Sequence, residues 1–531
     1  MSAQNTYNYI VVGAGSAGSA LAARLSEDPA NRVLLLEAGG KSHPWSVIPI
    51  GYARMIDNPA VNWCYSSEPE VSTNGRRIPV PRGRMLGGSS SINGLVFVRG
   101  QARDFDTWAQ LGNPGWSYAD VLPVYKRLEN YSHGSDQFRG RSGPLKVTLP
   151  EVRGPLFDAL VAGCAELGIP HNQDYNGATQ EGIALSQATI ANGRRMSTAR
   201  GYLKPNQHRA NLDIRTGALT SKIQIDQGRA QAVEYIVDGQ SHVAYASEDI
   251  ILSAGSINSP QLLELSGIGQ PEHLQELGIT VRHALPGVGE NLRDHYAPRT
   301  RWEISAKGAT FNDSGRGFGL LGQVFRYLTE GQGMLCMPAA PFRAFVKTRD
   351  GLDDPDALLG WVPMLYEPGY KLSNQPGATC YAHAIRPDST GSVHIADSNP
   401  KTPPSIRFNF LSASTDIDTT LRAVRLARSI MKSKALNGLG TKELAPGESI
   451  ESDDELLDWV KANAETTYHP VGTCKMGNDP MAVVDHKLRV HGIENLRVAD
   501  ASVMPTMPSG NTNAPSIMIG ERAADFILES A

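Results

Sequence analysis

The stretch TTYHPVGTCK, residues 466–475, holds the side chains whose types and spacing could most directly do chemistry. His469 stands before a proline and five residues ahead of Cys474. An imidazole here could bind a metal, activate the thiol, accept a proton beside a bound cofactor, or simply fill the core. A metal site lacks further ligands at suitable spacing, and a thiol nucleophile lacks an orienting third group and oxyanion donors. The surrounding elements must decide between the remaining interpretations.

A βαβ unit is predicted near the N-terminus, in residues 7–40. An apolar run over residues 9–12 predicts a strand, the small residues that follow predict a helix ending near Leu25, and residues 32–36 predict a second strand. Glycines fall at the turn from the first strand into the helix. This order of strand, glycines, helix and strand is typical of a dinucleotide site.

Each glycine of this turn has a separate physical reason. Gly13 permits the tight turn, Gly15 lets the backbone approach a pyrophosphate at the helix N-terminus, and Gly18 allows close packing of helix on strand. Glu37 ends the second strand, where its carboxylate can accept hydrogen bonds from ribose hydroxyls. The same carboxylate would repel a 2′-phosphate and so disfavours NADP, but it does not separate NAD from FAD.

Two further segments join small residues to apolar ones. Residues 82–100, RGRMLGGSSSINGLVFVRG, are interpreted either as a loop entering a buried strand or as part of a binding site. Residues 250–269 predict an apolar strand that passes through small residues into a helix, which Ser259 and Pro260 could start. Several such turns would suit a long dinucleotide.

The amino-acid composition changes between about residues 300 and 460, where aromatic and Met-rich stretches alternate with polar loops. We interpret this region as a substrate domain or cap, although Met and aromatic residues of this kind are more often plain core. Repeats and low-complexity linkers are missing from the sequence, so the domains are expected to be interleaved along the chain.

Composition excludes several classes of function. The 531 residues are 40% hydrophobic and 20% charged, and the formal net charge of −4 offers no basic field for nucleic acid. Five scattered cysteines fit reduced thiols and give no zinc pattern. The N-terminus does not resemble a signal peptide, and no apolar run approaches the ~20 residues of a membrane span. These features predict a cytoplasmic protein.

Four runs together resemble the glucose-methanol-choline (GMC) family of flavin oxidoreductases. They are GRMLGGSSSINGLVFVRGQARDFD (83–106), GSINSPQLLELSGIG (255–269), GVGENLRDH (287–295) and the C-terminal segment 498–527. The similarity covers nearly the whole chain, and within the family it is greatest to bacterial choline-dehydrogenase-like and aliphatic alcohol or sorbose dehydrogenases. The resemblance implies FAD as cofactor and an alcohol oxidised to an aldehyde or ketone by hydride transfer to flavin N5.

The resemblance also implies a split α/β fold. A Rossmann-like FAD-binding domain would comprise residues 1–157, 206–300 and 461–531. An interleaved α+β substrate domain, built on a large antiparallel sheet, would comprise residues 158–205 and 301–460.

For the opening stretch, the resemblance assigns roles to two side chains. His469 matches the family histidine that lies over the flavin, and Asn511 matches the second residue of the pair, which is His or Asn. The chemistry suits such a pair, because hydride leaves carbon only if the hydroxyl proton is removed at about the same time. Asn511 would hold the substrate oxygen without titrating.

The expected cofactor contacts are placed by motif position. They are Gly13, Gly15, Ser16, Ala17, Gly18, Glu37, Ala38, Trp63, Arg84, Gly87, Asn93, Gly94, Leu95, Val96, Thr220, Ala254, Tyr468, Asp500, Ala501, Thr512 and Asn513.

Two departures from relatives refine the expectation. Ile92 stands where some members attach FAD through a histidine, so the flavin is expected to be non-covalent. Pro341 stands where related dehydrogenases often carry a glutamate, and a choline ammonium would want such a carboxylate and an aromatic cage. A neutral primary alcohol is therefore favoured. Candidate wall residues are Met334, Met337, Phe342, Trp361, Met364 and Tyr366.

Other functions stay open on the sequence. An oxidase of the same family that makes hydrogen peroxide, or a choline dehydrogenase, would use the same motifs with another acceptor or substrate. A flavin electron-transfer protein would have no use for the pair formed by His469 and Asn511, and an NAD-dependent dehydrogenase would not need the C-terminal motif. We favour a dehydrogenase that passes the electrons to an acceptor other than NAD. The candidate acceptors are a quinone, a dye-like compound and, for the oxidase alternative, oxygen, and the chain could form oligomers.

Overall fold

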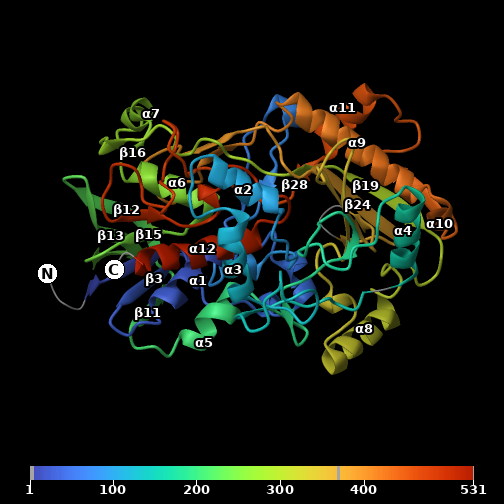
Figure 1. The fold of residues 1–531 in the computed structure, drawn as a ribbon, viewed down its shortest axis with the longest axis horizontal. Helices are drawn as coiled ribbons and strands as arrows, with labels where there is room; N and C mark the ends of the chain where they lie inside the picture. Colours follow the sequence, from blue (N-terminus) through green and yellow to red (C-terminus); the bar gives the residue numbers. More distant parts are fainter. Residues whose placement is uncertain (1–4, 153, 368–370, 530–531) are drawn as a thin grey trace.

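A parallel sheet organises one half of the computed structural model, which describes residues 5–152, 154–367 and 371–529 (Figure 1). Its five strands in the described residues run in the order β11-β3-β2-β15-β29, and every neighbouring pair is parallel. In that order the bounds are Leu212–Thr216, Val33–Glu37, Tyr9–Val12, Ile250–Leu252 and Leu496–Val498.

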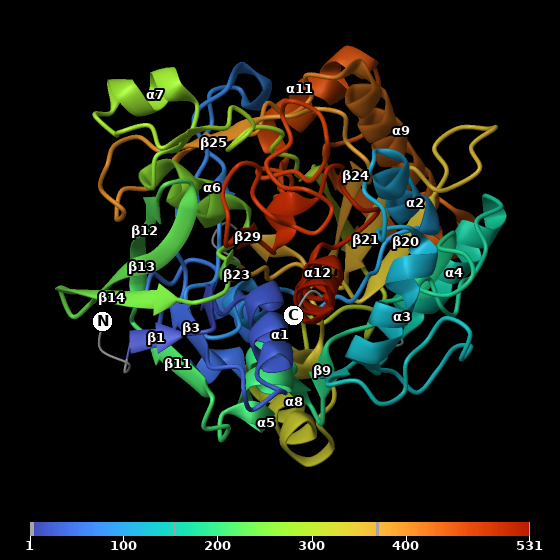
Figure 2. The same cartoon turned by 60° about the vertical axis from the view of Figure 1, so that its left-hand side comes forward.

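The sequence of these strands explains their central position. The runs YIVV of β2, VLLLE of β3 and IIL of β15 are buried at every residue. Such continuous apolar strands are typical of parallel sheets that are covered on both faces. One cover is the pair α1 (Ser16–Leu25) and α12 (Asn513–Leu528), which lie side by side in both views although they come from opposite ends of the chain (Figures 1 and 2).

A smaller, mostly antiparallel sheet packs against the first. Its order is β1-β14-β13-β12, with bounds Thr6–Tyr7, Gln240–Ala246, Arg229–Val237 and Leu219–Asp226. Two of its strands contact β2 and β3, so it extends the core of the first half.

An antiparallel sheet organises the other half of the molecule. Its order is β27-β19-β24-β21-β20-β8, with bounds Thr441–Ala445, Arg299–Ile304, Gly377–Ala384, Ala357–Val362, Phe342–Val346 and Gly182–Leu185. Helix α9 (Ser414–Met431) packs on β21 and β24, and α4 (Pro155–Glu166), α10 (Lys434–Asn437) and α11 (Asp453–Asn463) pack beside it (Figure 1). A second large core fills this half.

Six further helices in the described residues lie outside these two groups. They are α2 (Ala102–Gln110), α3 (Tyr118–Leu128), α5 (Lys204–Asn206), α6 (Gly255–Leu265), α7 (Pro271–Glu276) and α8 (Gly317–Glu330). The short strands are β4 (Tyr65–Ser66), β5 (Pro79–Val80), β6 (Glu129–Asn130), β7 (Leu145–Lys146), β9 (Ile190–Ala191), β10 (Arg194–Arg195), β16 (Ile268–Gly269), β17 (His283–Ala284), β18 (Tyr296–Ala297), β22 (Tyr366–Glu367), β23 (Lys371–Leu372), β25 (Ser392–His394), β26 (Ser405–Arg407) and β28 (Glu465–Thr466).

The architecture confirms the expected α/β fold with a large antiparallel sheet in its second half. The residue boundaries expected for the two domains stay a prediction. The expected start of α6 at Ser259 and Pro260 is wrong, because the helix begins about a turn earlier at Gly255, whose N–H donates to the Asp500 carboxylate at 2.8 Å. Among the described residues, no helix combines the length and apolar character of a membrane span.

Candidate active site

A cavity of about 770 Å³ lies between the two halves of the molecule. Its wall includes Gly13 after β2, Ala38 after β3 and Ala254 after β15, which stand at the carboxyl ends of parallel strands. Other parts of the wall come from Leu358 on β21 and Tyr381 on β24. Ligands of open parallel sheets bind at this edge, so the cavity is the candidate site.

The glycine turn forms one end of the cavity. Gly13 has φ +102°, and a Cβ there would stand 2.5 Å from the Ser253 carbonyl oxygen, so only glycine fits. A Cβ at Gly15 would meet only the Ser253 carbonyl oxygen, at 3.9 Å, and Gly15 lines the cavity. At Gly18 a Cβ would overlap the Gly13 carbonyl, so this glycine brings α1 close to the turn and does not itself line the wall.

Glu37 lies at the end of β3 with both carboxylate oxygens engaged. One oxygen accepts from the Ala14 N–H at 3.1 Å and the other from the Gly39 N–H at 2.8 Å. Burial raises the pKa of Glu37 to about 7, against the opposing effect of these two bonds. Each oxygen keeps a lone pair that can accept from a ligand hydroxyl.

Three helices begin at the cavity. Ser16 of α1, Gly255 of α6 and Asn513 of α12 are first helical residues and all line the wall. The Ser16 hydroxyl donates to the Asn513 side chain at 2.7 Å, which holds the starts of α1 and α12 together. Helix N-termini carry partial positive charge and free N–H groups, so this end of the cavity favours an anionic ligand.

His469 and Asn511 meet at another part of the same wall. The Asn511 Nδ2 lies 2.9 Å from the His469 Nε2. His469 follows β28, and its N–H donates to the buried Asp294 carboxylate at 2.9 Å. Asp294 also accepts from the His295 N–H at 2.7 Å, so one buried carboxylate positions both histidines.

Neighbouring bonds define which nitrogen of His469 is free to accept a proton. The His295 Nε2 lies 2.9 Å from the Ile385 carbonyl oxygen and must therefore donate to it. A neutral His295 then accepts at Nδ1, which is 3.1 Å from the His469 Nδ1. We infer that His469 carries its hydrogen on Nδ1, which leaves the Nε2 lone pair facing the Asn511 amide.

Arg343 fixes the amide of Asn511 from the opposite side. Its Nη1 donates to the Asn511 Oδ1 at 3.1 Å, and its Nε donates to the Ser186 hydroxyl at 2.8 Å. Since a guanidinium can only donate, the amide oxygen must face Arg343 and the NH₂ must face His469. Arg343 is fully buried on β20.

Charge and burial favour a neutral His469. Burial, followed by the neighbouring His383 and the guanidinium groups of Arg82 and Arg343, holds the pKa of His469 well below its usual value. A neutral imidazole is the form that can take a proton. Burial also raises the pKa of Cys474 well above its usual value, which removes the thiolate that a nucleophile pair would need.

Comparisons with known proteins agree over nearly the whole chain. Sequence models of the GMC oxidoreductase N- and C-terminal regions match residues 7–297 and 387–520. The chain belongs to the GMC oxidoreductase family. An oxygen-dependent choline dehydrogenase of Sinorhizobium fredii is 44% identical over 98% of this chain and 95% of its own length. The human mitochondrial choline dehydrogenase is 41% identical over 99% of this chain and 90% of its own length.

Solved structures extend the comparison to oxidases. The chain is similar to pyridoxine 4-oxidase from Mesorbium loti with TM-score 0.89 and 30% identity, each chain being covered to 98%. A formate oxidase from Aspergillus oryzae gives TM-score 0.92 at 25% identity, over 99% of this chain and 98% of the other. As a GMC oxidoreductase, the chain is an FAD-dependent enzyme that oxidises the CH–OH group of an alcohol.

The residues of the cavity fit FAD. The Thr220 hydroxyl is buried and lacks a hydrogen-bond partner among the described residues, which leaves it free for a ligand. Trp63 stacks on Tyr65 with ring centroids 5.7 Å apart and lies in the wall, with the Arg84 guanidinium 4.9 Å from the Trp63 ring. Open backbone at Gly15, three helix starts and the Glu37 carboxylate complete a site for a dinucleotide.

Most of the expected site residues share this one cavity. Its wall contains His469, Asn511, Gly13, Gly15, Ser16, Ala17, Glu37, Ala38, Trp63, Asn93, Gly94, Leu95, Val96, Thr220, Ala254, Tyr468, Asp500, Ala501, Thr512 and Asn513. Gly18, Arg84 and Gly87 lie outside the wall, where the neighbouring Gly83 and Gly88 take part instead. Gly87 donates its N–H to the Ala14 carbonyl at 2.7 Å and so holds the second glycine loop against the first.

Sequence reasoning missed the charged surroundings of His469. The guanidinium groups of Arg82 and Arg343 supply the charge, His383 lies close by, and Asp294 and His295 position the ring. His383 lines the cavity, its Nδ1 donates to the Ala384 carbonyl at 2.8 Å, and burial lowers its pKa to about 4. The RDH of GVGENLRDH marked Asp294 and His295 as part of a motif, but no local pattern marked the other three.

The expected Met and aromatic wall is largely wrong. Met334, Met337, Phe342, Trp361 and Met364 belong to the core of the antiparallel half, and of the expected set only Tyr366 lines the cavity. Pro341 is buried beside the wall, which Ala339 and Ala340 form at this point.

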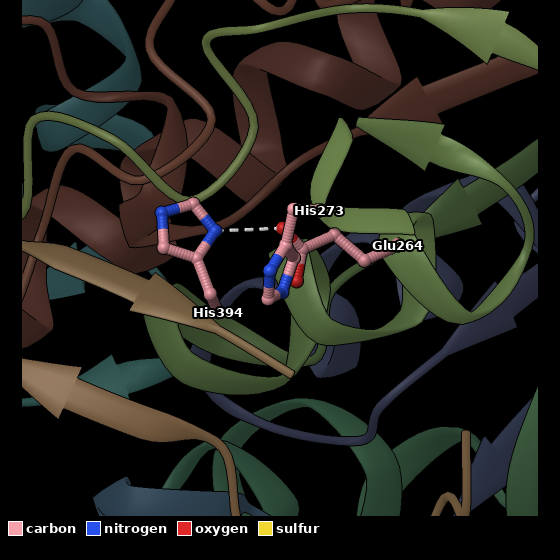
Figure 3. Close-up of side chains that lie close together, drawn as sticks. All are labelled: Glu264, His273 and His394. Atoms are coloured by element: carbon pink, nitrogen blue, oxygen red, sulfur yellow. Dashed lines mark hydrogen bonds and ion pairs between the residues drawn. The ribbon is translucent and has the colours of Figure 1, made fainter. Parts of the chain in front are cut away.

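A second cluster of titratable side chains lies on α6, α7 and β25 (Figure 3). One ligand atom from each of Glu264, His273 and His394 lies within 4.8 Å of the others. The His394 Nδ1 is 2.7 Å from Glu264 and its Nε2 is 3.1 Å from Glu290, and these bonds raise the pKa of His394 to about 9 despite burial. The His273 Nε2 donates to the Ile395 carbonyl at 3.0 Å. Hydrogen bonds already engage these side chains, which leaves them unavailable as metal ligands. We therefore assign the cluster a structural role.

Proposed function

We propose that this enzyme oxidises a neutral primary alcohol to the aldehyde, with His469 as the base. The observation that carries this proposal is the 2.9 Å contact inside the cavity between the His469 Nε2 and the Asn511 Nδ2, in which the inferred tautomer makes Nε2 the acceptor. FAD bound in the cavity would supply the acceptor for the hydride that leaves the alcohol carbon. The electrons then pass to an acceptor other than NAD.

Two side chains act on the hydroxyl group of the substrate. Alcohol oxidation removes a hydride from carbon and a proton from oxygen, so a base must stand at the oxygen. The Nε2 of His469 takes that proton. The NH₂ of Asn511, held in place by Arg343, donates to the same oxygen and fixes its position.

The cofactor contacts in the wall are proposed as the residues that hold FAD, without a covalent bond. Ile92 lines the cavity at the position where some relatives attach the flavin, and its side chain has no nucleophilic atom. The five scattered cysteines, all free, support a cytoplasmic location.

Choline is the second candidate substrate, because choline dehydrogenases are 41–44% identical to this chain. The charges around the cavity argue against it. The buried Arg343 and the half-buried Arg82 place two guanidinium groups near His469. The wall carboxylates Glu465 and Glu367 already have arginine partners, the second at 3.9 Å. A quaternary ammonium would be repelled by these guanidinium groups, of which only Arg82 has a carboxylate, Asp294, acting on it, whereas a neutral alcohol would not be repelled.

A panel of alcohols, each assayed once with oxygen and once with a dye acceptor, tests both substrate and acceptor. We expect neutral primary alcohols to give higher kcat/KM than choline, and the dye to support faster turnover than oxygen. A tenfold preference for choline would contradict the proposed substrate. Faster turnover with oxygen, accompanied by hydrogen peroxide, would favour the oxidase alternative that the similarity to oxidase structures allows.

A further inference from the structure

Helix α8 presents an apolar face to solvent. Phe318, Leu321, Phe325 and Leu328 are 92%, 64%, 69% and 74% exposed. Their spacing of three, four and three residues places them on one face of the helix. In both views α8 lies at the outer edge of the molecule (Figures 1 and 2). Single exposed apolar residues are common, but four large ones in a row along one helix are not.

The other face of α8 anchors the helix to the protein. Leu320 packs against the core of the antiparallel half, and Tyr327 packs against a small cluster that contains Leu95 and Ile190. The Gln323 side chain accepts from the Met334 N–H at 3.0 Å. The helix is therefore held in position, and its outer face is left without a partner among the described residues.

Arginines lie at both ends of α8. Arg316 immediately precedes its first turn, and Arg326 lies in its last turns. Arg194 and Arg200 act electrostatically on Tyr327, and the turn at Gly193 packs on Gly331 at the helix end.

The acidic groups nearby do not balance these arginines. Glu330 pairs with Arg326 at 3.1 Å, and Asp313 is exposed just before the helix. Three arginines thus remain against one carboxylate near α8: Arg316 at its start, and Arg194 and Arg200 near Tyr327 towards its end.

We propose that α8 docks this enzyme onto a membrane surface that carries anionic phospholipids. The four apolar side chains would enter the boundary of the acyl chains while the arginines meet the phosphate groups, which is the pattern of an interfacial helix. A second copy of the chain fits less well. A two-fold pairing places the same patch against itself, so it would bring the arginines of the two copies together.

Sedimentation of the FAD-loaded enzyme with vesicles tests this proposal. One set of vesicles is phosphatidylcholine alone, and the other contains added phosphatidylglycerol. We expect the wild type to sediment with the anionic vesicles, and less so at high salt. The variant Phe318→Ser, Phe325→Ser, Leu328→Ser should partition on the order of tenfold or more weakly, since about 1.4 kcal/mol of lost apolar burial is tenfold.

The control is Val71→Ser, which removes a side chain that is 93% exposed beside α11, away from α8. It should bind vesicles like the wild type, and all variants should keep their FAD and their rate on a water-soluble alcohol. Equal binding of the triple variant, or no binding of the wild type, would overturn the proposal. So would light scattering that shows a wild-type dimer and a monomeric triple variant without lipid, because α8 would then cover a second copy.

Discussion

A chain of hydrogen bonds from Arg343 through Asn511 and His469 to His295 controls where the proton stands in the site. Each donor in it follows from a neighbour that can only donate or only accept, namely the Arg343 guanidinium and the Ile385 carbonyl. The result is a lone pair on the His469 Nε2 and an oriented amide beside it. Arg343 thereby acts both as a positioning residue and as a fixed charge.

Replacing Arg343 by Met should change substrate preference and pH dependence together. Loss of the cation should raise kcat/KM for choline relative to a neutral alcohol on the order of tenfold, because a nearby charge inside a protein is worth one to several kcal/mol. It should also move the acid limb of the rate profile to higher pH, since Arg343 helps to lower the pKa of His469. Overall turnover should fall because Asn511 loses its partner.

The matched variant Arg343→Lys keeps the charge but loses the fork that reaches both Ser186 and Asn511. It should retain the discrimination against choline while losing turnover. If the Met and Lys variants discriminate equally, charge does not set the preference.

At the scale of elements, α6 serves two sites. Its N-terminus lines the cavity, and Glu264 near its C-terminal end joins the cluster with His394 of β25 and Glu290. Because the pKa of His394 is raised in the folded state, its contribution to stability is present below the unfolded value of 6.5 and is lost as pH rises through about 9.

The variant His394→Gln should therefore be less stable than the wild type at pH 6.5, by roughly 1–3 kcal/mol, and the difference should narrow by pH 9.5. Thermal midpoints measured across this range check it. His242→Gln, which changes an exposed histidine on β14, should give no such convergence. Curves for wild type and His394→Gln that stay parallel through pH 9.5 would show that the ion pairs do not stabilise the fold.

Across the whole molecule, the features that could be predicted from the sequence are those set by residues close together in the chain. The turn from Gly13 to Glu37 could be predicted because strand, helix and glycine spacing lie within one short segment, and the predicted acid does line the cavity. Arg82, His383 and Arg343 come from three segments that are far apart in the sequence and lie close together only in the folded protein. Their spacing in the sequence therefore could not predict that they surround His469. The Met and aromatic residues were wrongly predicted to line the cavity, because residues of these types also make up an ordinary hydrophobic core.

Cofactor removal probes the molecule as a whole, since both halves contribute to the cavity wall. Unfolding by acid or heat should release yellow FAD into the supernatant, because Ile92 cannot bond to it. Excess added FAD should raise the thermal midpoint of the apo protein, as a ligand at about 100 times its Kd stabilises by about 2.7 kcal/mol. Yellow colour that stays with the precipitate would establish a covalent link.

Anaerobic stopped-flow mixing of the FAD-loaded His469→Ala enzyme with its best alcohol tests whether His469 is the base. General-base catalysis contributes ~10²–10⁴ in rate, so flavin reduction should slow by that factor while FAD content stays near that of the wild type. His273→Ala, which removes a histidine of the other cluster, should reduce its flavin at the wild-type rate. A His469→Ala enzyme with full FAD that is reduced as fast as the wild type would show that the base lies elsewhere.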